Sequence, residues 1–162
     1  MDTLETQRLI IRPFGPADLN EAHAVLDLDL AWSGPGFTLD QRRQRLQFYV
    51  GLAQWNDTGR LYGLRAVVLR ESRQLIGICG FHPDSWSARW KAAFWPKLFN
   101  DTVTVGTHAS MELGLGYSLA HSARRQGYAT EAVEALLAHA FQTLQIGRVF
   151  AATERGNDAS WG

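Results

Sequence analysis

The sequence predicts a single α/β (α+β) domain in which helices flank a central mixed, mostly antiparallel sheet. A chain of 162 residues, 46% of them hydrophobic, is long enough to build one core. The expected elements run in the order strand, two helices, three strands, helix, strand and the start of a helix, which is not a regular alternation. No linker or repeat divides residues 1–162 into two domains.

The composition excludes several classes of function. Sixteen basic and sixteen acidic residues give no net charge, so there is no basic excess for nucleic acid or an anionic membrane surface. No segment has the roughly 18 apolar residues of a membrane span, and no signal peptide is recognisable. A soluble cytoplasmic protein is therefore expected. No Cys/His cluster has the spacing of a metal site, and Cys79, in an apolar run, is interpreted as a small buried hydrophobe.

Two helices are predicted in the first third of the chain. Residues 4–14 are interpreted as a first strand, after which a helix begins at Pro16. Thr38 and Gln41 have the spacing of a capping box, which predicts that a second helix starts there.

An antiparallel hairpin is expected next, with strands at 61–69 and 74–81 around a polar turn at 71–73. Residues 84–104 are rich in tryptophan and phenylalanine at helical spacing, but Pro96 interrupts them, so a short helix or two turns are expected. Core packing is the first interpretation of these aromatic residues. A wall of the substrate site or a dimer contact is the second.

The second half contains the most regular patterns. Residues 110–119 are interpreted as a strand in which Gly114 and Gly116 mark a bulge or a close backbone approach. A long helix is expected from Gln126 or Ala129 to Leu144, with Gly147 as its C-terminal cap. Its predicted buried stripe consists of Ala132, Val133, Leu136, Leu137, Ala140 and Phe141. Another strand is expected at 148–153.

A short basic loop, residues 124–129, lies between the predicted strand and this helix. A helix N-terminus exposes unpaired backbone N–H groups and a partial positive charge, which suits an anion. Gly127 lets a phosphate approach the backbone, and Arg124 and Arg125 are suitable phosphate donors. A solvated surface turn would explain the loop taken alone equally well, and its position favours the anion site.

The segment Arg124-Arg125-Gln126-Gly127-Tyr128-Ala129 resembles the acyl-CoA signature of the GNAT superfamily, which is Arg or Gln, two residues, Gly, one residue, and Gly or Ala. Residues 5–13, 127–132, 148–149 and 157–160 are similar, in order, to segments of its ribosomal-protein alanine acetyltransferase (Rim-type) branch. The resemblance implies the GNAT fold and direct transfer of an acetyl group from acetyl-CoA to a primary amine. A protein N-terminus, an aminoglycoside-like amine, a polyamine and an amino acid all remain candidate acceptors.

The resemblance also implies which residues hold acetyl-CoA. The diphosphate would lie on the backbone amides of the loop, the pantetheine arm would pair with the end of the preceding strand, and Asn157 would bond to that arm or cap its helix. The implied cosubstrate-binding residues are Tyr117, Ser118, Leu119, Arg124, Arg125, Gln126, Gly127, Tyr128, Ala129, Thr130 and Asn157.

Catalysis requires a base for the amine, an oxyanion donor and a proton for the thiolate. Glu112 is the proposed base, because it has the same strand parity as Gly114, where Rim-type relatives often carry Glu; an ordinary exposed carboxylate is the alternative. His108 shares that parity, whereas His82 and His121 are interpreted as loop residues. Ser160 would help the thiolate to leave, or would simply occupy a first helical turn.

Relatives continue beyond this point through a helix and a closing β-hairpin, whereas this sequence ends at Gly162. A shortened chain or a partner chain that completes the domain is expected, with weak or no activity for the 162-residue monomer; a homodimer is one option. Two rival interpretations are a non-catalytic GNAT-like module that binds CoA as a sensor or scaffold, and an unrelated phosphate-binding α/β protein.

Overall fold

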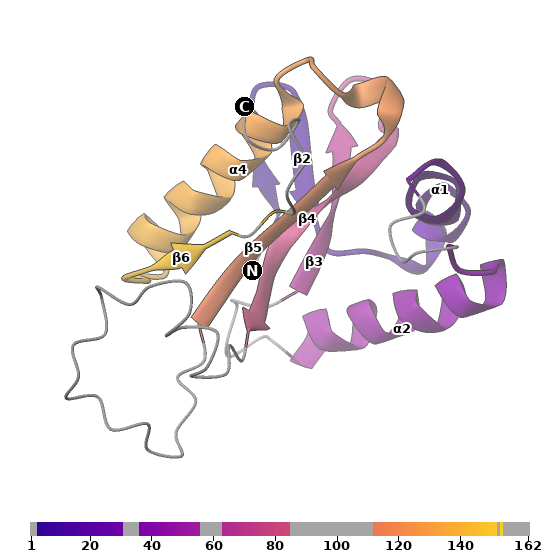
Figure 1. The fold of residues 1–162 in the computed structure, drawn as a ribbon, viewed down its shortest axis with the longest axis horizontal. Coiled ribbons are helices and arrows are strands. Elements are labelled where there is room, and N and C mark those ends of the chain that lie inside the picture. The colour runs from indigo at the N-terminus through magenta and orange to yellow at the C-terminus, as the bar shows by residue number, and fades with distance from the viewer. Residues whose placement is uncertain (1–2, 31–35, 56–62, 85–111, 152, 154–162) are drawn as a thin grey trace.

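The computed structural model describes residues 3–30, 36–55, 63–84, 112–151 and 153. They form a six-stranded sheet in the order β1-β2-β3-β4-β5-β6. Every neighbouring pair is antiparallel except β5 and β6, which are parallel. The predicted mixed, mostly antiparallel sheet with flanking helices is therefore confirmed (Figure 1).

The first predicted strand is two strands. β1 (Leu4–Glu5) and β2 (Leu9–Arg12) form a tight hairpin. Thr6 closes the turn, because its backbone N–H donates to the carbonyl of Leu9 and its Oγ1 accepts a hydrogen bond from the Leu9 N–H at 2.9 Å. The polar residues of this turn interrupt the apolar pattern, and the single strand expected at 4–14 was wrong for that reason.

The two predicted N-terminal helices are present. The first consists of three helical segments in succession, η1 (Pro16–Asp18), α1 (Leu19–His23) and the wider π-helical turn η2 (Ala24–Asp29). The second is α2 (Leu39–Trp55). The capping box is confirmed, since the Thr38 N–H donates to Gln41 Oε1 at 2.9 Å and the Gln41 N–H donates to Thr38 Oγ1 at 3.3 Å.

A buried ion pair ties these two helical segments together. Nε of Arg42 on α2 lies 2.7 Å from Oδ2 of Asp27 on η2, and Arg42 Nη2 lies 2.7 Å from Oδ1. The Phe37 N–H and the His23 ring also contact this carboxylate. Burial would raise the pKa of Asp27, but these hydrogen bonds and the Arg42 charge outweigh burial and lower it.

The predicted hairpin is confirmed as β3 (Gly63–Leu69) and β4 (Leu75–Asp84). β4 extends three residues beyond its predicted end at Phe81, so His82 lies in a strand and its assignment to a loop was wrong. β5 (Glu112–Leu119) pairs with β4 in an unbroken register from Gly77↔Leu119 to Asp84↔Glu112. The bulge considered at Gly114 is therefore absent from this pairing.

The long C-terminal-half helix is α4 (Tyr128–Ala138), continued by a π-helical turn, η4 (His139–Thr143). Most of the predicted stripe faces the sheet, but Phe141 is 44% exposed because the wider turn leaves Ala140 on the sheet and rotates Phe141 outward. Gly147 is not the cap: Gln145 takes the left-handed conformation (φ 54°), and the Ile146 N–H donates to the carbonyl of Ala140. β6 (Val149–Phe150) follows.

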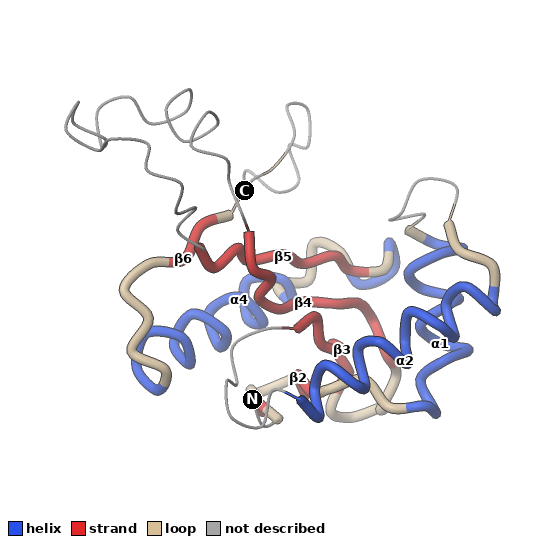
Figure 2. Tube along the Cα trace, turned by 90° about the horizontal axis from the view of Figure 1, so that it is seen from below, coloured by secondary structure: helices blue, strands red, loops and turns tan. Residues whose placement is uncertain are grey.

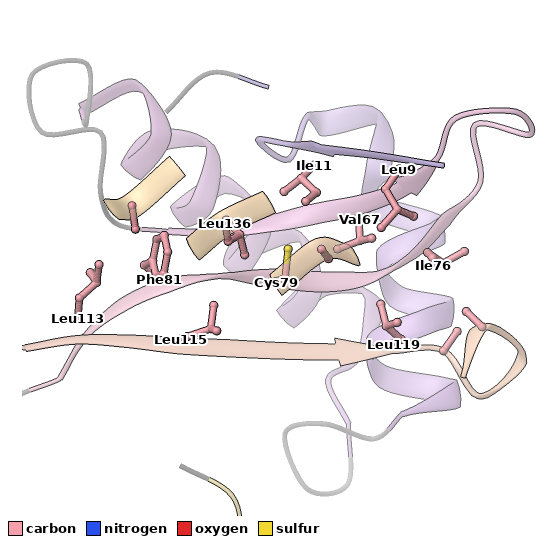
Figure 3. Packing of buried hydrophobic residues seen from close by; sticks show 14 residues of the cluster. Leu9, Ile11, Val67, Ile76, Cys79, Phe81, Leu113, Leu115, Leu119 and Leu136 are labelled. Carbon is pink, nitrogen blue, oxygen red and sulfur yellow. The ribbon is translucent and has the colours of Figure 1, made fainter. Parts of the chain in front are cut away.

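The sheet lies between α4 on one face and the helices α1 and α2 on the other (Figures 1 and 2). A hydrophobic cluster fills the space on each side of the sheet. One lies between the sheet and α4 and includes Ile11, Cys79, Phe81, Leu115 and Leu136 (Figure 3). The other lies between the opposite face and the helices α1 and α2. Alternate residues of β2, β3 and β4 contribute to opposite clusters, as a pleated sheet covered on both faces requires. None of the described helices is long and apolar enough to cross a membrane.

Candidate active site

The loop between β5 and α4 contains positive φ angles, which residues other than glycine rarely adopt. After β5, a short helical turn, η3 (His121–Ala123), leads into residues 124–127. Arg125 has φ 58° and Gly127, the N-cap of α4, has φ 79°. Glycine is the residue that takes this left-handed conformation without steric cost, so Gly127 allows the chain to turn directly into the helix.

This turn leaves a row of backbone donors available. Tyr128, Ala129 and Thr130 are the first three residues of α4, where a helix has no internal acceptor for its N–H groups. Among the described residues, no acceptor is found for these three N–H groups or for those of Arg125 and Gly127, whereas the Glu131 N–H donates to the Gly127 carbonyl. These donors lie at the positive end of the helix dipole, an arrangement that binds phosphate groups.

The side chains of the loop brace its own backbone. Nε of Arg124 donates to the Leu119 carbonyl at 3.2 Å, and Nε2 of Gln126 donates to the Ser122 carbonyl at 2.7 Å. Arg124 is thus directed in part to the end of β5, while the Arg125 side chain is exposed. Neither contact uses a backbone N–H of the loop, so the donors remain open.

Arg8, in the turn between β1 and β2, clamps this loop from outside. Its Nη1 donates to the Gln126 carbonyl at 2.9 Å, and its guanidinium carbon lies 4.5 Å from the centre of the Tyr128 ring. A methyl group built on Gly127 would come within 3.3 Å of Arg8 Nη2. Arg8 therefore contacts the loop at the Gln126 carbonyl and the Tyr128 ring, on either side of Gly127.

Glu131 holds Arg8 in place. Its carboxylate accepts hydrogen bonds from Arg8 Nε at 2.6 Å, from the Arg8 backbone N–H at 2.8 Å and from Thr6 Oγ1 at 2.5 Å. Burial would raise the pKa of Glu131, but the hydrogen bonds from Thr6 and Arg8 outweigh it, so the pKa lies below its ordinary value. The carboxylate is therefore charged at neutral pH, as the clamp requires.

A second carboxylate supports the other side of the loop. Asp29, at the end of η2, accepts a hydrogen bond from the His121 backbone N–H at 2.8 Å, and its Oδ1 lies 2.8 Å from His121 Nδ1. The hydrogen bonds from His121 lower the pKa of Asp29. His121 is in a connecting turn, as expected, and Asp29 couples the helical layer to that turn.

The strand that precedes the loop has one edge that is only partly paired. β6 pairs with β5 through Leu113 and Gly114 alone. From Leu115 to Leu119, that edge of β5 has no strand partner among the described residues. The three residues expected to bind pantetheine lie here; Tyr117 and Ser118 are half-buried and Leu119 is buried. The edge leads to the open amides of the loop, so one extended ligand could contact both.

The predicted catalytic residues are only partly described. Glu112 starts β5 opposite Asp84 and, because strand residues alternate, shares the parity of Gly114. Ser160, Asn157, His108 and the aromatic segment 84–104, apart from Asp84, lie outside the described residues. Within the described part of the chain, no three His, Cys, Asp or Glu side chains form a metal-binding group. Cys79 is buried, and burial raises the pKa of its thiol to about 12.

Sequence reasoning assigned no role to Arg8 or Asp29 and placed His82 in a loop. Arg8 was visible within the motif of residues 5–13, but its partners are over a hundred residues away in the chain. His82 lies opposite Gly114 on β5, and its ring covers that glycine. Two glycines at alternate positions, Gly114 and Gly116, were the available signal, because they leave room on one face for a neighbouring side chain.

Residues 8–162 match the acetyltransferase (GNAT) domain family. The chain is 25% identical over 171 residues to the uncharacterized N-acetyltransferase p20 of Bacillus licheniformis, covering 99% of this chain and 78% of that protein. A putative GNAT-family acetyltransferase from Bordetella pertussis has a similar structure, with a TM-score of 0.69, 23% identity, and coverage of 99% and 84% of the two chains.

Coenzyme A is present in another similar structure, RimL, described as a ribosomal L7/L12 alpha-N-protein acetyltransferase in complex with CoA. Its TM-score is 0.69 at 17% identity, and the match covers 98% of this chain and 78% of that one. The family resemblance found in the sequence is thereby confirmed.

Proposed function

This chain belongs to the GNAT acetyltransferase family, an acyl-CoA-dependent group of enzymes, and we propose that it acetylates a primary amine by direct attack of the amine on acetyl-CoA. The acceptor would be a protein N-terminus or a small-molecule amine. The observation that supports this proposal is the row of open N–H groups at the start of α4, next to the partly unpaired edge of β5.

In this proposal the backbone N–H groups of residues 125–130 bind the diphosphate of acetyl-CoA, with charge from Arg124 and Arg125. The pantetheine arm lies along β5 at Tyr117, Ser118 and Leu119. The thioester then lies near Gly114, where β5 and β6 last pair. Backbone N–H groups and the helix dipole supply partial positive charge at the site itself. A diphosphate can therefore be bound by a protein whose net charge is zero.

The chemical step needs three groups around the thioester. A backbone N–H of β5 stabilises the oxyanion that forms when the amine attacks the carbonyl carbon. Glu112 is the carboxylate of β5 that could accept the amine proton, and Ser160 is assigned to the departing thiolate. Asn157 is assigned to the pantetheine arm. These roles rest on the family resemblance.

Binding and turnover can be tested separately. Calorimetry with CoA and acetyl-CoA measures affinity, and a thiol reagent then follows CoA release with a peptide bearing a free N-terminus, an aminoglycoside, a polyamine and an amino acid. Cys79 is the only cysteine and is buried, so the folded protein contributes no background to this assay. The same peptide with a blocked N-terminus is the control. The absence of any CoA affinity would contradict the proposal.

A further inference from the structure

The His82 imidazole occupies the space beside two glycines of the neighbouring strand. His82 is paired with Gly114, and a methyl group built on Gly114 would lie 2.4 Å from His82 Cε1 and 2.9 Å from both ring nitrogens. A methyl group on Gly116 would lie 3.6 Å from Cδ2 and 3.7 Å from Nε2. The ring therefore crosses β5 between these two glycines and occupies space that any other residue at position 114 would fill.

The ring also reaches the strand beyond. Its centre lies 6.5 Å from that of the Phe150 ring, with the two planes at 87°, an edge-to-face contact. Gly114↔Phe150 is the last described pair between β5 and β6. His82 thus extends from β4 across β5 to the point where the parallel pair ends, and its side chain is nonetheless exposed.

We propose that His82 is the general base of the acetyl transfer, supplied by β4 rather than by β5. This inference rests on the proposed function, because it needs the thioester to lie at the end of the β5–β6 pair. Imidazole is the side chain that changes charge between pH 5 and 8, which suits it to accept a proton from an amine near neutral pH.

A ring nitrogen of His82 accepts one proton from the ammonium form of the acceptor, and the freed amine attacks the thioester carbon. The C–N bond forms and the C–S bond breaks. The amine nitrogen then loses a second proton, which is transferred to the sulfur of the CoA thiolate. The proton on His82 then passes to water. The products are the acetylated amine, CoA with a free thiol and one proton released.

Beyond the pair of His82 and Gly114, the next strand positions with the same parity carry two acidic residues. Asp84 and Glu112 form the next pair of the same parity on β4 and β5. β6 contributes Phe150, which is uncharged, and β5 contributes the two glycines. A pH profile must therefore separate the imidazole from Glu112, which is the carboxylate candidate for the same role.

Two replacements separate proton transfer from packing. His82→Phe keeps a ring over Gly114 and Gly116 and an edge for Phe150, but has no nitrogen; His82→Gln keeps polarity without a base at neutral pH. With an acceptor from the amine panel, both should lower kcat by about 10²- to 10⁴-fold. Acetyl-CoA affinity and Tm should stay close to those of the wild type, and the rise of kcat between pH 5 and 8 should disappear. Added imidazole should partly restore His82→Ala.

Matched variants serve as controls. His23→Gln changes a histidine whose ring contacts Asp27 in the helical layer, and it should leave kcat within about twofold of the wild type. Glu112→Gln tests the rival base, and the rise of kcat between pH 5 and 8 should remain in this variant. If kcat of His82→Phe is within threefold of the wild-type value, the assignment to His82 is wrong. It is also wrong if Glu112→Gln alone removes the rise of kcat between pH 5 and 8. The proposed function stands in both cases.

A measurement without an acceptor covers the case in which no panel amine reacts. Nitrogen NMR of the His82 ring, with signals assigned by the His82→Gln variant, should shift when acetyl-CoA saturates the full chain. An unmoved His82 signal with acetyl-CoA bound overturns the inference alone. Absence of acetyl-CoA binding overturns the proposed function and this inference with it.

The position of the ring can be checked independently of activity. With His82 present, Gly114→Ala places a methyl group 2.4 Å from the ring, so the ring or the strand must move and Tm should fall. In a His82→Ala background, the same change should cost much less, because the space is then empty. Equal losses of Tm in both backgrounds would show that the ring does not cover Gly114.

Discussion

Nε of Arg8 lies 2.6 Å from Oε2 of Glu131, joining the turn between β1 and β2 to the first turn of α4, the helix that follows the loop at residues 124–127. The same guanidinium donates to the Gln126 carbonyl and lies over Tyr128. The shape of the loop is therefore set from outside, by a residue at the opposite end of the sequence.

Replacing Arg8 by Gln should loosen the loop while leaving the fold intact. Arg8 is 42% exposed, so its ion pair contributes about 1 kcal/mol or less to the free energy of unfolding. CoA affinity, measured by calorimetry, should fall by about 3- to 10-fold, because the loop amides must be ordered on binding.

Arg70→Gln is the matched control. Arg70 also contacts the β1–β2 turn, through the Thr6 carbonyl at 2.8 Å, but it has no described contact with the loop. Its removal should change CoA affinity by less than about twofold. Equal losses from both variants would show that Arg8 acts through the turn as a whole.

Gly127→Ala should weaken both stability and CoA binding. A side chain at φ 79° costs about 1–2 kcal/mol, and the added methyl group would come within 3.3 Å of Arg8 Nη2. Thermal unfolding and CoA titration measure the two effects. Gly51→Ala, at an exposed position inside α2 where the new methyl group meets nothing within 4 Å beyond its own stretch of helix, should instead stabilise by about 0.5–1 kcal/mol.

Acid should release the Arg8 clamp. The folded-state pKa of Glu131 lies below its ordinary value, so the stability it contributes is present above the unfolded-state pKa and is lost as the pH falls through the folded-state pKa. Denaturant unfolding from about pH 6 to about pH 3 should therefore show a smaller gap between wild type and Glu131→Gln at the acid end. A constant gap would mean that the carboxylate charge contributes nothing.

The buried pair between Asp27 and Arg42 should show strong coupling. The two side chains are 0% and 2% exposed, so Arg42→Met leaves a buried carboxylate without its cation and should cost about 3–5 kcal/mol. Asp27→Asn combined with Arg42→Met should cost less than the sum of the two single changes, as measured by denaturant unfolding. Additive losses would contradict a direct interaction.

Cys79 should report global unfolding. Its thiol is buried with a pKa of about 12, so alkylation by iodoacetamide at neutral pH should be slow in the native protein. Mass spectrometry should show modification that accelerates in denaturant in parallel with loss of helix signal. Rapid labelling without unfolding would mean that the sheet opens locally at β4.

Local patterns allowed much of the fold to be predicted. The capping box at Thr38, the hairpin around residues 71–73 and the glycine before α4 all depend on residues close in sequence. Where the prediction failed, a distant partner or a change of helix geometry was responsible. The turn at Thr6 is held by Glu131, and the wider turn at His139 moves Phe141 into solvent.

The sequence alone determined the family, the mixed sheet and the position of the turn between β5 and α4, because each is written in contiguous residues whose backbone preferences and periodicity act locally. Only the tertiary structure decided that Arg8 clamps the loop, that Asp29 supports His121, and that the His82 ring covers Gly114. These contacts depend on strand register and on packing between segments far apart in the chain, and no local preference specifies either.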